Sequence, residues 1–453
     1  MSSSSLLSRR STAELELPVP PEFRCPISLD LMRDPVVGPT GITYDRAGIE
    51  AWLLAAGARK TATTCPVTKG DLRADDLVPN HALRRVIQAW CVANRCRGVE
   101  RIPTPRVPVT PVQAGDVLGE VEAAARAGDV ARCGAAVREV GRLARESDRD
   151  RRCLASAGAA RALAAAVASF AVAADSSASS VLLDDVLAAL VLVMPLDEEA
   201  IVAIGSSTAS VALLANVAKH GDLQRRLQAV VVIREIVALS SCCSRNGAAT
   251  TAIDLSDNLD GIIEVLVNTI RDPISPQATK ASLVAAYHLA LADDHAAARL
   301  AEAGLVPSLV ELLIDGDRST SEKALAALDA TLASEAGRAR ARADALAVPV
   351  LVKKMFRVSD TATELVVSTL HRICKKWHGD DEVDSPAAAR RSAVVEAVQV
   401  GAFQKVMMLL QVGCRDATKE KATELLKLMI KYETRGGGGC IDAMDFRGLK
   451  RVS

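Results

Sequence analysis

Residues 21–53 read PEFRCPISLDLMRDPVVGPTGITYDRAGIEAWL, and after a short loop residues 65–90 read CPVTKGDLRADDLVPNHALRRVIQAW. The sequence around residues 34–44 is rich in turn formers and β-branched residues, which indicates short strands. Two segments with helical periodicity follow it. These two stretches therefore predict a small α+β unit at the start of the chain.

Both expected helices in this unit show apolar residues at the spacing of one helical face. The first has Ile49, Trp52, Leu53 and Ala56, and the second has Leu83, Val86, Ile87 and Trp90. Asp45 and Asn80 stand ahead of these runs as candidate N-caps, because their side chains can accept hydrogen bonds from the first free N–H groups of a helix.

In order and over their full length, the two stretches resemble the U-box family, and VERIPTPR at residues 99–106 looks like the linker of its plant subgroup with armadillo repeats. The resemblance implies a RING-like domain at residues 21–95. RING domains hold two zinc ions with eight Cys or His ligands. Residues 21–90 contain only Cys25, Cys65 and His81 of these types. We therefore expect no metal and no cofactor.

The resemblance implies that hydrogen bonds, ion pairs and packed side chains replace the metals. The candidates for polar contacts are Ser28, Asp30, Asp34, Arg46 and Thr68, and those for packing are Leu31, Val36 and Trp90. Cys25 and Cys65 fall where the family has packed core residues. A thioester-forming role for either cysteine is disfavoured, since neither has a His placed nearby in the sequence as a base.

The family's surface for a ubiquitin-conjugating enzyme maps onto Ile27, Trp52 and Pro66, and their neighbours Pro26, Leu53 and Val67 complete it. Trp52 shares a helical stripe with core positions, so core packing and partner contact are equally open for it. Lys69 stands where the family can place a basic residue that positions the ubiquitin thioester. Arg would suit this task better, because its planar group donates several hydrogen bonds.

Composition bounds the rest of the chain. With 453 residues, at least two structural units are expected. Hydrophobic residues make up 49% and aromatic residues 2%, which favours closely packed helices. The 55 basic and 55 acidic residues balance, which argues against a nucleic-acid partner. No apolar run reaches the roughly 20 residues of a membrane span. The 11 cysteines lack framework spacing, so free thiols in the cytoplasm, and also in the nucleus, are expected.

Four prolines between residues 98 and 115 predict a stiff linker at residues 96–116. Residues 117–432 read as short helices with a recurring phrase, as in AGLVPSLVELL at residues 303–313. The phrase recurs with a period in the low forties and with insertions, and its markers are Gly158, the weaker Gly205, Gly261, Gly304, Ala347 and Gly401. This period matches an armadillo-type α-solenoid of about seven units, beginning with residues 117–145. We expect flexible tails at residues 1–20 and 433–453 and a loop insertion at residues 379–385.

The resemblance implies a ubiquitin ligase that acts by holding a conjugating enzyme charged with ubiquitin near a protein substrate on the armadillo groove. The plant subgroup suggests stress or immune signalling. The alternative is a non-enzymatic armadillo adaptor. Armadillo importins use ordered Trp and Asn arrays, whereas this solenoid has one tryptophan, Trp377. The sequence leaves a homo-oligomer open.

Overall fold

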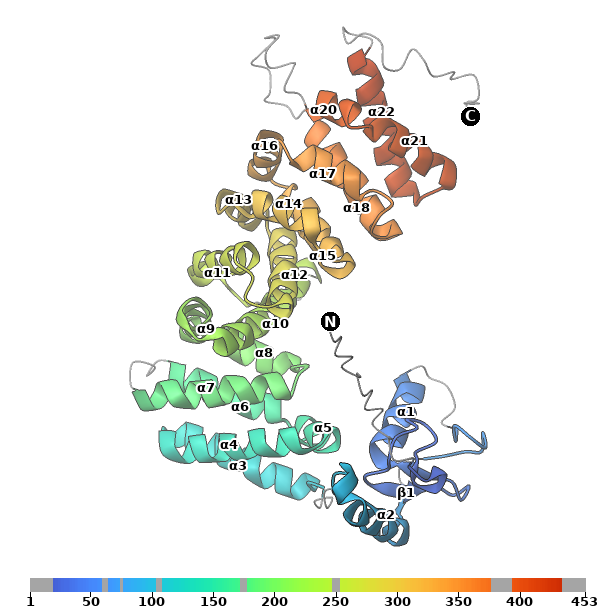
Figure 1. The fold of residues 1–453 in the computed structure, drawn as a ribbon. Coiled ribbons are helices and arrows are strands. Elements are labelled where there is room, and N and C mark those ends of the chain that lie inside the picture. The colour runs from blue at the N-terminus through green and yellow to red at the C-terminus, as the bar shows by residue number, and fades with distance from the viewer. Residues whose placement is uncertain are drawn as a thin grey trace, which may run out of the picture. The chain divides into compact units, whose positions relative to one another are not determined.

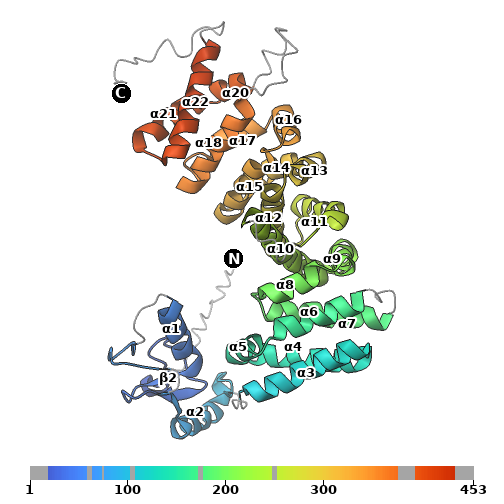
Figure 2. The same cartoon turned by 180° about the vertical axis from the view of Figure 1, so that it is seen from behind.

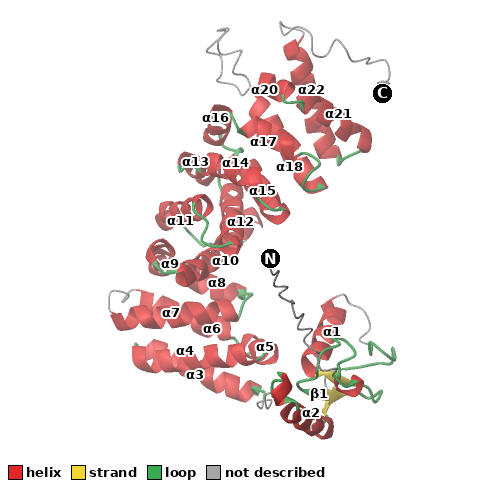
Figure 3. Ribbon diagram, viewed as in Figure 1, coloured by secondary structure: helices red, strands yellow, loops and turns green. Residues whose placement is uncertain are grey.

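The computed structural model describes residues 19–58, 64–73, 76–102, 108–171, 177–246, 253–375 and 393–433. The chain divides into two compact units, Met1–Val107 and Pro108–Ser453. Among the described residues, strands occur in the first unit and the second is built from helices (Figure 3). The tails predicted at residues 1–20 and 433–453 lie almost wholly outside the described residues, and the insertion predicted at 379–385 lies wholly outside them.

The first unit contains a small antiparallel sheet with strand order β2-β1-β3. Val36 of β1 stands opposite Tyr44 of β2 and Pro79 of β3. The elements are β1 (Pro35–Val37), β2 (Thr43–Asp45), α1 (Arg46–Ala58), β3 (Val78–Pro79) and α2 (His81–Ala93), with 3₁₀ turns at Pro21–Phe23 and Arg95–Arg97. The expected α+β unit with two helices is confirmed.

The two candidate N-caps turn out differently. The side chain of Asn80 accepts a hydrogen bond from the backbone N–H of Leu83 at 3.1 Å, so this cap is confirmed. Asp45 directly precedes α1, but its Oδ1 accepts from the N–H groups of Arg33 and Asp34 at 2.8 and 2.9 Å. That oxygen therefore joins β2 to the chain ahead of β1, a long-range contact that local sequence does not reveal.

A single apolar core holds the first unit together. Phe23 and Trp90 pack edge to face with ring centroids 5.8 Å apart. The buried members are Phe23, Cys25, Met32, Val36, Tyr44, Ile49, Leu53, Cys65, Leu72, Leu77, Ile87, Cys91 and Ile102. Leu31 and Trp90 are partly buried against this core, and Val36 is fully buried, as their predicted packing roles require.

The linker predicted at residues 96–116 is shorter than expected at both ends. Ile102 is buried in the core of the first unit. The first solenoid helix begins at Pro111, where the first helical position needs no backbone N–H donor. Thr110 and Gln113 form a reciprocal capping box there. The last of the four prolines is therefore the first residue of a helix and does not belong to the linker.

The second unit is a solenoid whose helices follow one another in chain order (Figures 1 and 2). Within the described residues they form seven consecutive groups, as predicted. The groups are α3 (Pro111–Ala127) and α4 (Val130–Glu146); α5 (Asp148–Ser156), α6 (Ala159–Phe170) and α7 (Ser177–Leu192); α8 (Glu198–Gly205), α9 (Thr208–His220) and α10 (Leu223–Asn246); α11 (Leu259–Arg271) and α12 (Pro276–Ala292); α13 (Asp294–Glu302), α14 (Leu305–Asp315) and α15 (Arg318–Thr331); α16 (Glu335–Ala343), α17 (Ala347–Lys354) and α18 (Asp360–Cys374); and α20 (Ala393–Gln399), α21 (Ala402–Val412) and α22 (Asp416–Glu433).

Three of the predicted markers sit at the turn into a group's central helix. Gly158, Gly304 and Gly401 have φ values of 92°, 90° and 81°, a backbone conformation that favours glycine. Gly261 differs, because it lies inside α11, which begins at Leu259. Gly261 therefore marks a repeat, as predicted, but does not form the turn that precedes its helix.

The last helices of successive groups, α4, α7, α10, α12, α15, α18 and α22, pack on one another along the solenoid. One continuous core, from Ala114 to Met429, lies beneath them. Charged pairs join neighbouring helices of this series at Arg138–Asp185 (3.1 Å), Arg225–Asp184 (2.8 Å) and Arg372–Asp329 (3.1 Å), and a hydrogen bond joins His371 to Glu424 (2.7 Å). Apolar stacking inside and ion pairs nearer the surface thus recur from group to group.

No single helix in the described part of the chain is both long enough and apolar enough to cross a membrane. Three bent helix pairs, α5 with α6, α8 with α9 and α20 with α21, reach that length and composition only together, with bends of 68°, 88° and 75°.

Candidate functional site

Two loops of the first unit have the same backbone design. In the first, the N–H of Cys25 donates to the carbonyl of Asp30 at 2.8 Å, and the N–H of Leu29 donates to Cys25 at 2.8 Å. In the second, Cys65 donates to Gly70 at 2.7 Å and Lys69 donates to Cys65 at 3.0 Å. Leu29 and Lys69 both have φ of 61°. The sequences CPISLD and CPVTKG thus form two equivalent, internally bonded loops.

Helix α1 is attached to both loops. A Cβ added to Gly48 would lie 3.8 Å from Cβ of Ile27, an ordinary van der Waals distance, so the first loop lies against the helix at this position. One turn later, the indole N–H of Trp52 donates to the carbonyl of Thr64 at 2.9 Å. Thr64 leads directly into the second loop, which carries Pro66. The first loop and the residue that leads into the second loop therefore contact α1 one helical turn apart.

The residues expected on the partner surface differ in how far their side chains are exposed. Trp52 is 39% exposed and Val67 is 52% exposed. Ile27 and Pro66 are half-buried, and Pro26 is exposed. Leu53 is only 8% exposed and belongs to the core, so its expected place on the partner surface is wrong. Trp52 is therefore not a fully buried core side chain.

Lys69 lies on the second loop, as predicted, with an exposed side chain. Its ammonium group donates a hydrogen bond to the carbonyl of Pro66 at 3.0 Å. The lysine therefore closes its own loop and holds its positive charge beside one of the contact residues.

Cys65 is the centre of a hydrogen-bond network behind the second loop. Its sulfur lies 2.9 Å from the hydroxyl of Tyr44, 3.5 Å from that of Thr40 and 3.4 Å from the backbone N of Thr68. Burial by itself would raise the pKa of the Cys65 thiol, but hydrogen bonds from Thr40, Thr68 and Tyr44 lower it to about 6. Burial and the neighbouring sulfur raise the pKa of Tyr44.

The other cysteine holds the first loop in a related way. The sulfur of Cys25 accepts a hydrogen bond from the backbone N–H of Asp45 at 3.3 Å. Both cysteines are 0% exposed. A low pKa favours a reactive thiolate, yet a sulfur that is buried and committed to hydrogen bonds cannot reach a ubiquitin thioester. Both are structural residues, and both are free thiols.

The remaining predicted polar residues contribute unequally. Arg46 and Asp34 form an ion pair at 2.7 Å, as expected. The Oγ of Ser28 accepts from the N–H of Asp30 at 3.4 Å, inside the first loop. Asp30 is exposed and contributes its backbone carbonyl to Cys25. Thr68 acts on the sulfur of Cys65. Among the described residues, no group of three or more His, Cys, Asp or Glu side chains is arranged to hold a metal ion.

Sequence reasoning missed Thr40, Tyr44 and Gly48. The sequence could have indicated Tyr44, because a buried tyrosine hydroxyl in a strand usually has a hydrogen-bond partner. Which sulfur or loop these residues would meet depends on the tertiary fold.

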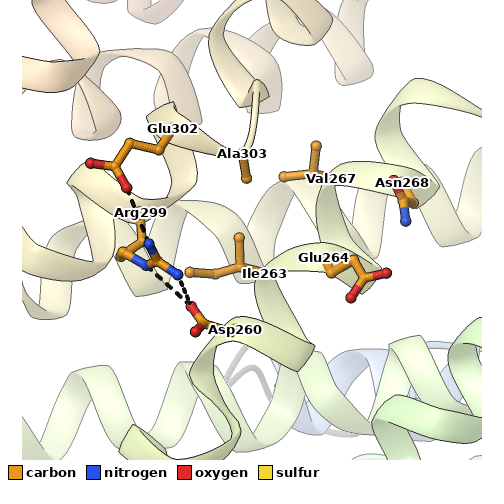
Figure 4. Close-up of a pocket in the computed structure, with 8 residues that line it drawn as sticks. All are labelled: Asp260, Ile263, Glu264, Val267, Asn268, Arg299, Glu302 and Ala303. Carbon is orange, nitrogen blue, oxygen red and sulfur yellow. Dashed lines mark hydrogen bonds and ion pairs between the residues drawn. The ribbon is translucent and has the colours of Figure 1, made fainter.

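The solenoid carries a hollow between α11 and α13, which we call the paired hollow (Figure 4). Its charges neutralise one another. Arg299 binds Asp260 at 2.6 Å and Glu302 at 3.2 Å. Glu264, also on its wall, is bound by Lys219 at 2.6 Å. This network fastens α13 to α11 and α9 to α11, so the paired hollow serves the stacking of the helices.

Comparisons with known proteins cover both units. The family model described as "U-box domain" matches residues 19–96, and the model described as "Plant U-box protein ARM repeat region" matches residues 116–450. U-box domain-containing protein 21 of Arabidopsis thaliana is 37% identical, covering 97% of this chain and 94% of the relative. E3 ubiquitin-protein ligase PUB23 of the same plant is 32% identical, covering 91% and 93%. E3 ubiquitin-protein ligase PUB22 is 30% identical, covering 91% and 94%.

Proposed function

The chain belongs to the plant U-box family of ubiquitin ligases with armadillo repeats, and from this premise we propose that Ile27, Trp52 and Pro66 bind a ubiquitin-conjugating enzyme while the solenoid binds the protein substrate. The observation that carries the proposal is the attachment of both loops to α1. The contact of Ile27 with the helix at Gly48 and the hydrogen bond from Trp52 to Thr64 support a common face for Ile27, Trp52 and Pro66.

The character of this face suits a shallow protein contact. An aromatic ring with its polar edge already bonded, flanked by Ile27 on one loop and Pro66 on the other, offers apolar area without an unsatisfied donor. Interface energy concentrates in a few such anchors. The half-buried state of Ile27 and Pro66 fixes their positions while leaving surface for the partner.

In the proposed mechanism the chain supplies position rather than a nucleophile. The amine of a substrate lysine attacks the thioester carbonyl on the conjugating enzyme, the amide bond forms, and the enzyme's thiolate leaves. The proton of the amine is lost as the bond forms. Buried Cys25 and Cys65 take no part. Holding both reactants on one chain raises their effective concentration, which is the source of the acceleration.

We assign Lys69 the supporting task of positioning the thioester. Its side chain is exposed, and within the described part of the chain its ammonium group donates to the Pro66 carbonyl of its own loop. Rotation of the side chain away from that carbonyl would present a cation to ubiquitin beside the bound conjugating enzyme. A single ammonium is a less directional donor than a guanidinium, so its contribution is expected to be modest.

The solenoid's role in the proposal is to recruit substrate for this reaction. Stacked helical repeats offer an extended surface that can hold a partner along several groups. We propose the cytoplasm and the nucleus as the sites of action, with stress or immune signalling as the setting, on the strength of the balanced charge and of kinship with plant U-box proteins.

The test is truncation of the two loop anchors. Ile27→Ala and Pro66→Ala should each weaken binding of the conjugating enzyme by about fivefold or more and reduce self-ubiquitination in parallel, because each removes an anchor of a small interface. The matched control is Val86→Ala, which removes exposed apolar surface from α2 of the same unit. Binding is measured by isothermal titration and folding by circular dichroism. Wild-type affinity in both folded loop variants would exclude this surface.

Trp52→Phe adds a second readout. It keeps an aromatic ring but removes the N–H that bonds to Thr64. If the indole acts by tethering the second loop, the variant should weaken partner binding and speed amide hydrogen exchange at residues 64–70. If it acts only as a contact surface, binding should weaken while exchange stays unchanged.

A further inference from the structure

A second hollow on the solenoid, which we call the cationic hollow, lies where the α14–α15 and α17–α18 turns meet. It has a volume of about 210 Å³. Its lining residues are Ile314, Gly316, Arg318, Ser321, Lys353, Lys354, Arg357 and Val358. Two consecutive groups of the solenoid therefore contribute four cations and no carboxylate to one concave surface.

These cations are poorly neutralised. Among the described residues, Arg318 has a carboxylate within ion-pair distance, Glu322 at 3.5 Å, whereas Lys353 and Arg357 have none. Lys354 donates a hydrogen bond to the hydroxyl of Ser321 at 3.4 Å, which is a neutral partner. The excess positive charge is therefore built into the lining of the hollow.

Electrostatics at the edge of the hollow agree with this geometry. Burial lowers the pKa of Lys354, the like charges of Lys353 and Arg357 lower it further, and Asp315 opposes the change. Lys405, whose ammonium donates to the carbonyl of Val352, has its pKa lowered by burial and by Arg357. These cations repel one another, and a bound anion would relieve that repulsion.

The paired hollow shows that this charge excess is not general to the solenoid. There, Arg299 is held by Asp260 and Glu302 (Figure 4). Glu264 is paired with Lys219. Both hollows lie between adjacent groups of the same solenoid. Only in the second do the cations outnumber the carboxylates of the described lining.

We propose that the cationic hollow binds the phosphoryl group of a phosphorylated serine or threonine in the substrate of the ligase. The inference rests on the proposed substrate-binding role of the solenoid and names the chemistry that it recognises. A phosphoryl group carries close to two negative charges and three strong acceptor oxygens. Arg318 and Arg357 can donate in fork geometry, while Lys353 and Lys354 add point charges. A carboxylate would leave more of this positive charge unmatched.

The apolar members of the lining support a peptide rather than a free ion. Ile314 is 37% exposed, and Val358 is half-buried beside it in the lining. They offer contact to the side chains that flank a phosphorylated residue. Inorganic phosphate would use the cations but not this surface.

The experiment is competitive acetylation of lysines in the full chain, read by mass spectrometry. A short synthetic peptide with one phosphoserine should slow acetylation of Lys353 and Lys354 severalfold and leave exposed Lys427 of α22 unchanged. The serine peptide should give no protection and the glutamate peptide weaker protection. Arg357→Gln should raise the peptide concentration needed for protection by about tenfold, through loss of a charge-assisted contact. Arg340→Gln on α16 is the matched control and should change nothing.

The remaining arms distinguish the alternatives. The proposal is overturned if the phosphopeptide gives no protection, if the serine peptide protects equally, or if inorganic phosphate protects as well at the same concentration. Protection by vesicles of anionic lipid without protection by the phosphopeptide would assign the hollow to a membrane surface and also overturn it. Self-ubiquitination by the same samples is measured in parallel. Intact ligase activity without phosphopeptide protection refutes this inference alone, and protection without ligase activity refutes the proposed function alone.

Discussion

The U-box unit and the armadillo solenoid are stabilised in different ways. In the U-box, Tyr44, Thr40 and Thr68 converge on one buried sulfur, and Asp45 bonds back to the chain ahead of β1. The contacts of Tyr44, Thr40 and Asp45 join segments that are distant in sequence, whereas that of Thr68 lies within the second loop. In the solenoid, a continuous apolar core is repeated from group to group and each group contacts its neighbours. A small unit with few irreplaceable contacts should fail as a whole, whereas a repeated one should fail locally.

The largest expected effect comes from removing a fully buried side chain in each unit. Tyr44→Ala should cost about 3–5 kcal/mol, a large part of the stability of so small a domain. Leu309→Ala in α14 should cost about 2–5 kcal/mol, but we expect the loss to stay near its own group. Hydrogen exchange of the full chain should show the whole U-box opening in the first variant. In the second, faster exchange should be confined to α13–α18.

Uniform loss of protection along the whole solenoid in Leu309→Ala would break the comparison, since the repeats would then unfold as one unit. Tyr44→Phe serves as the milder companion variant. It keeps the ring and removes the hydroxyl that bonds to Cys65, so about 1 kcal/mol is expected.

A smaller effect should separate the two kinds of Arg–Asp pair. Arg46 and Asp34 in the U-box are 20% and 27% exposed, whereas Arg138 and Asp185 in the solenoid are 59% and 31% exposed. Arg46→Gln should cost about 1.5–3 kcal/mol, the range for hydrogen bonds to charged groups. Arg138→Gln should cost less than about 1 kcal/mol and nothing measurable at high salt.

Pulse proteolysis in urea, with fragments of each unit followed by mass spectrometry, measures both costs in one chain. If Arg46→Gln and Arg138→Gln lower the free energy of unfolding equally, or respond equally to salt, the U-box ion pair stabilises its unit no more than the solenoid ion pair does.

The smallest expected effect is a pH dependence confined to the last solenoid groups. Burial lowers the pKa of His371 below its ordinary value of 6.5, and Glu424, bonded at 2.7 Å, partly opposes this. The folded state thus favours the neutral ring. The neutral ring contributes to the free energy of unfolding at pH values above the ordinary pKa. This contribution is lost as the pH falls from the ordinary pKa through the lower pKa of the folded state. Lys375 and Lys421 act in the same direction as burial.

His371→Gln should therefore make the stability of α18–α22 less sensitive to pH between about 7.5 and 5.5, a window that lies above the titration of Glu424. Hydrogen exchange at the two pH values, corrected for intrinsic rates, measures the change. The amides of α3 and α4, which contain no histidine, serve as the internal control. An identical pH response in the wild type and the variant would show that His371 does not cause the pH dependence.

Local signals predicted much of this fold. The Asn80 cap, the two helix stripes and the glycine turns at Gly158, Gly304 and Gly401 each depend on a few neighbouring residues, so the sequence contained the information. The boundary at Pro111 was misjudged because proline is both a linker residue and a good first residue of a helix. Ile102 was assigned to the linker because burial in a core is set by residues far from it in sequence.

The candidate site also combines features that the sequence could predict with features that depend on the tertiary fold. Ile27, Trp52 and Pro66 came from resemblance, and the contacts at Gly48 and Thr64 support a common face for them. The Cys65 network and the placement of Leu53 in the core could not be predicted, because a helical stripe does not say which edge faces the core. The cationic hollow was also beyond the sequence, since its cations lie on separate turns of two groups.

The ties between α1 and the two loops have a consequence for the rate at which partners exchange. Since Trp52 is bonded to Thr64 and Gly48 lies against Ile27 in the chain alone, the loops are already ordered before any encounter, and association should lose little conformational entropy. Encounters should then be limited by diffusion and orientation rather than by loop rearrangement. Variants of this face should accordingly differ in how long a conjugating enzyme stays bound and much less in how fast it arrives.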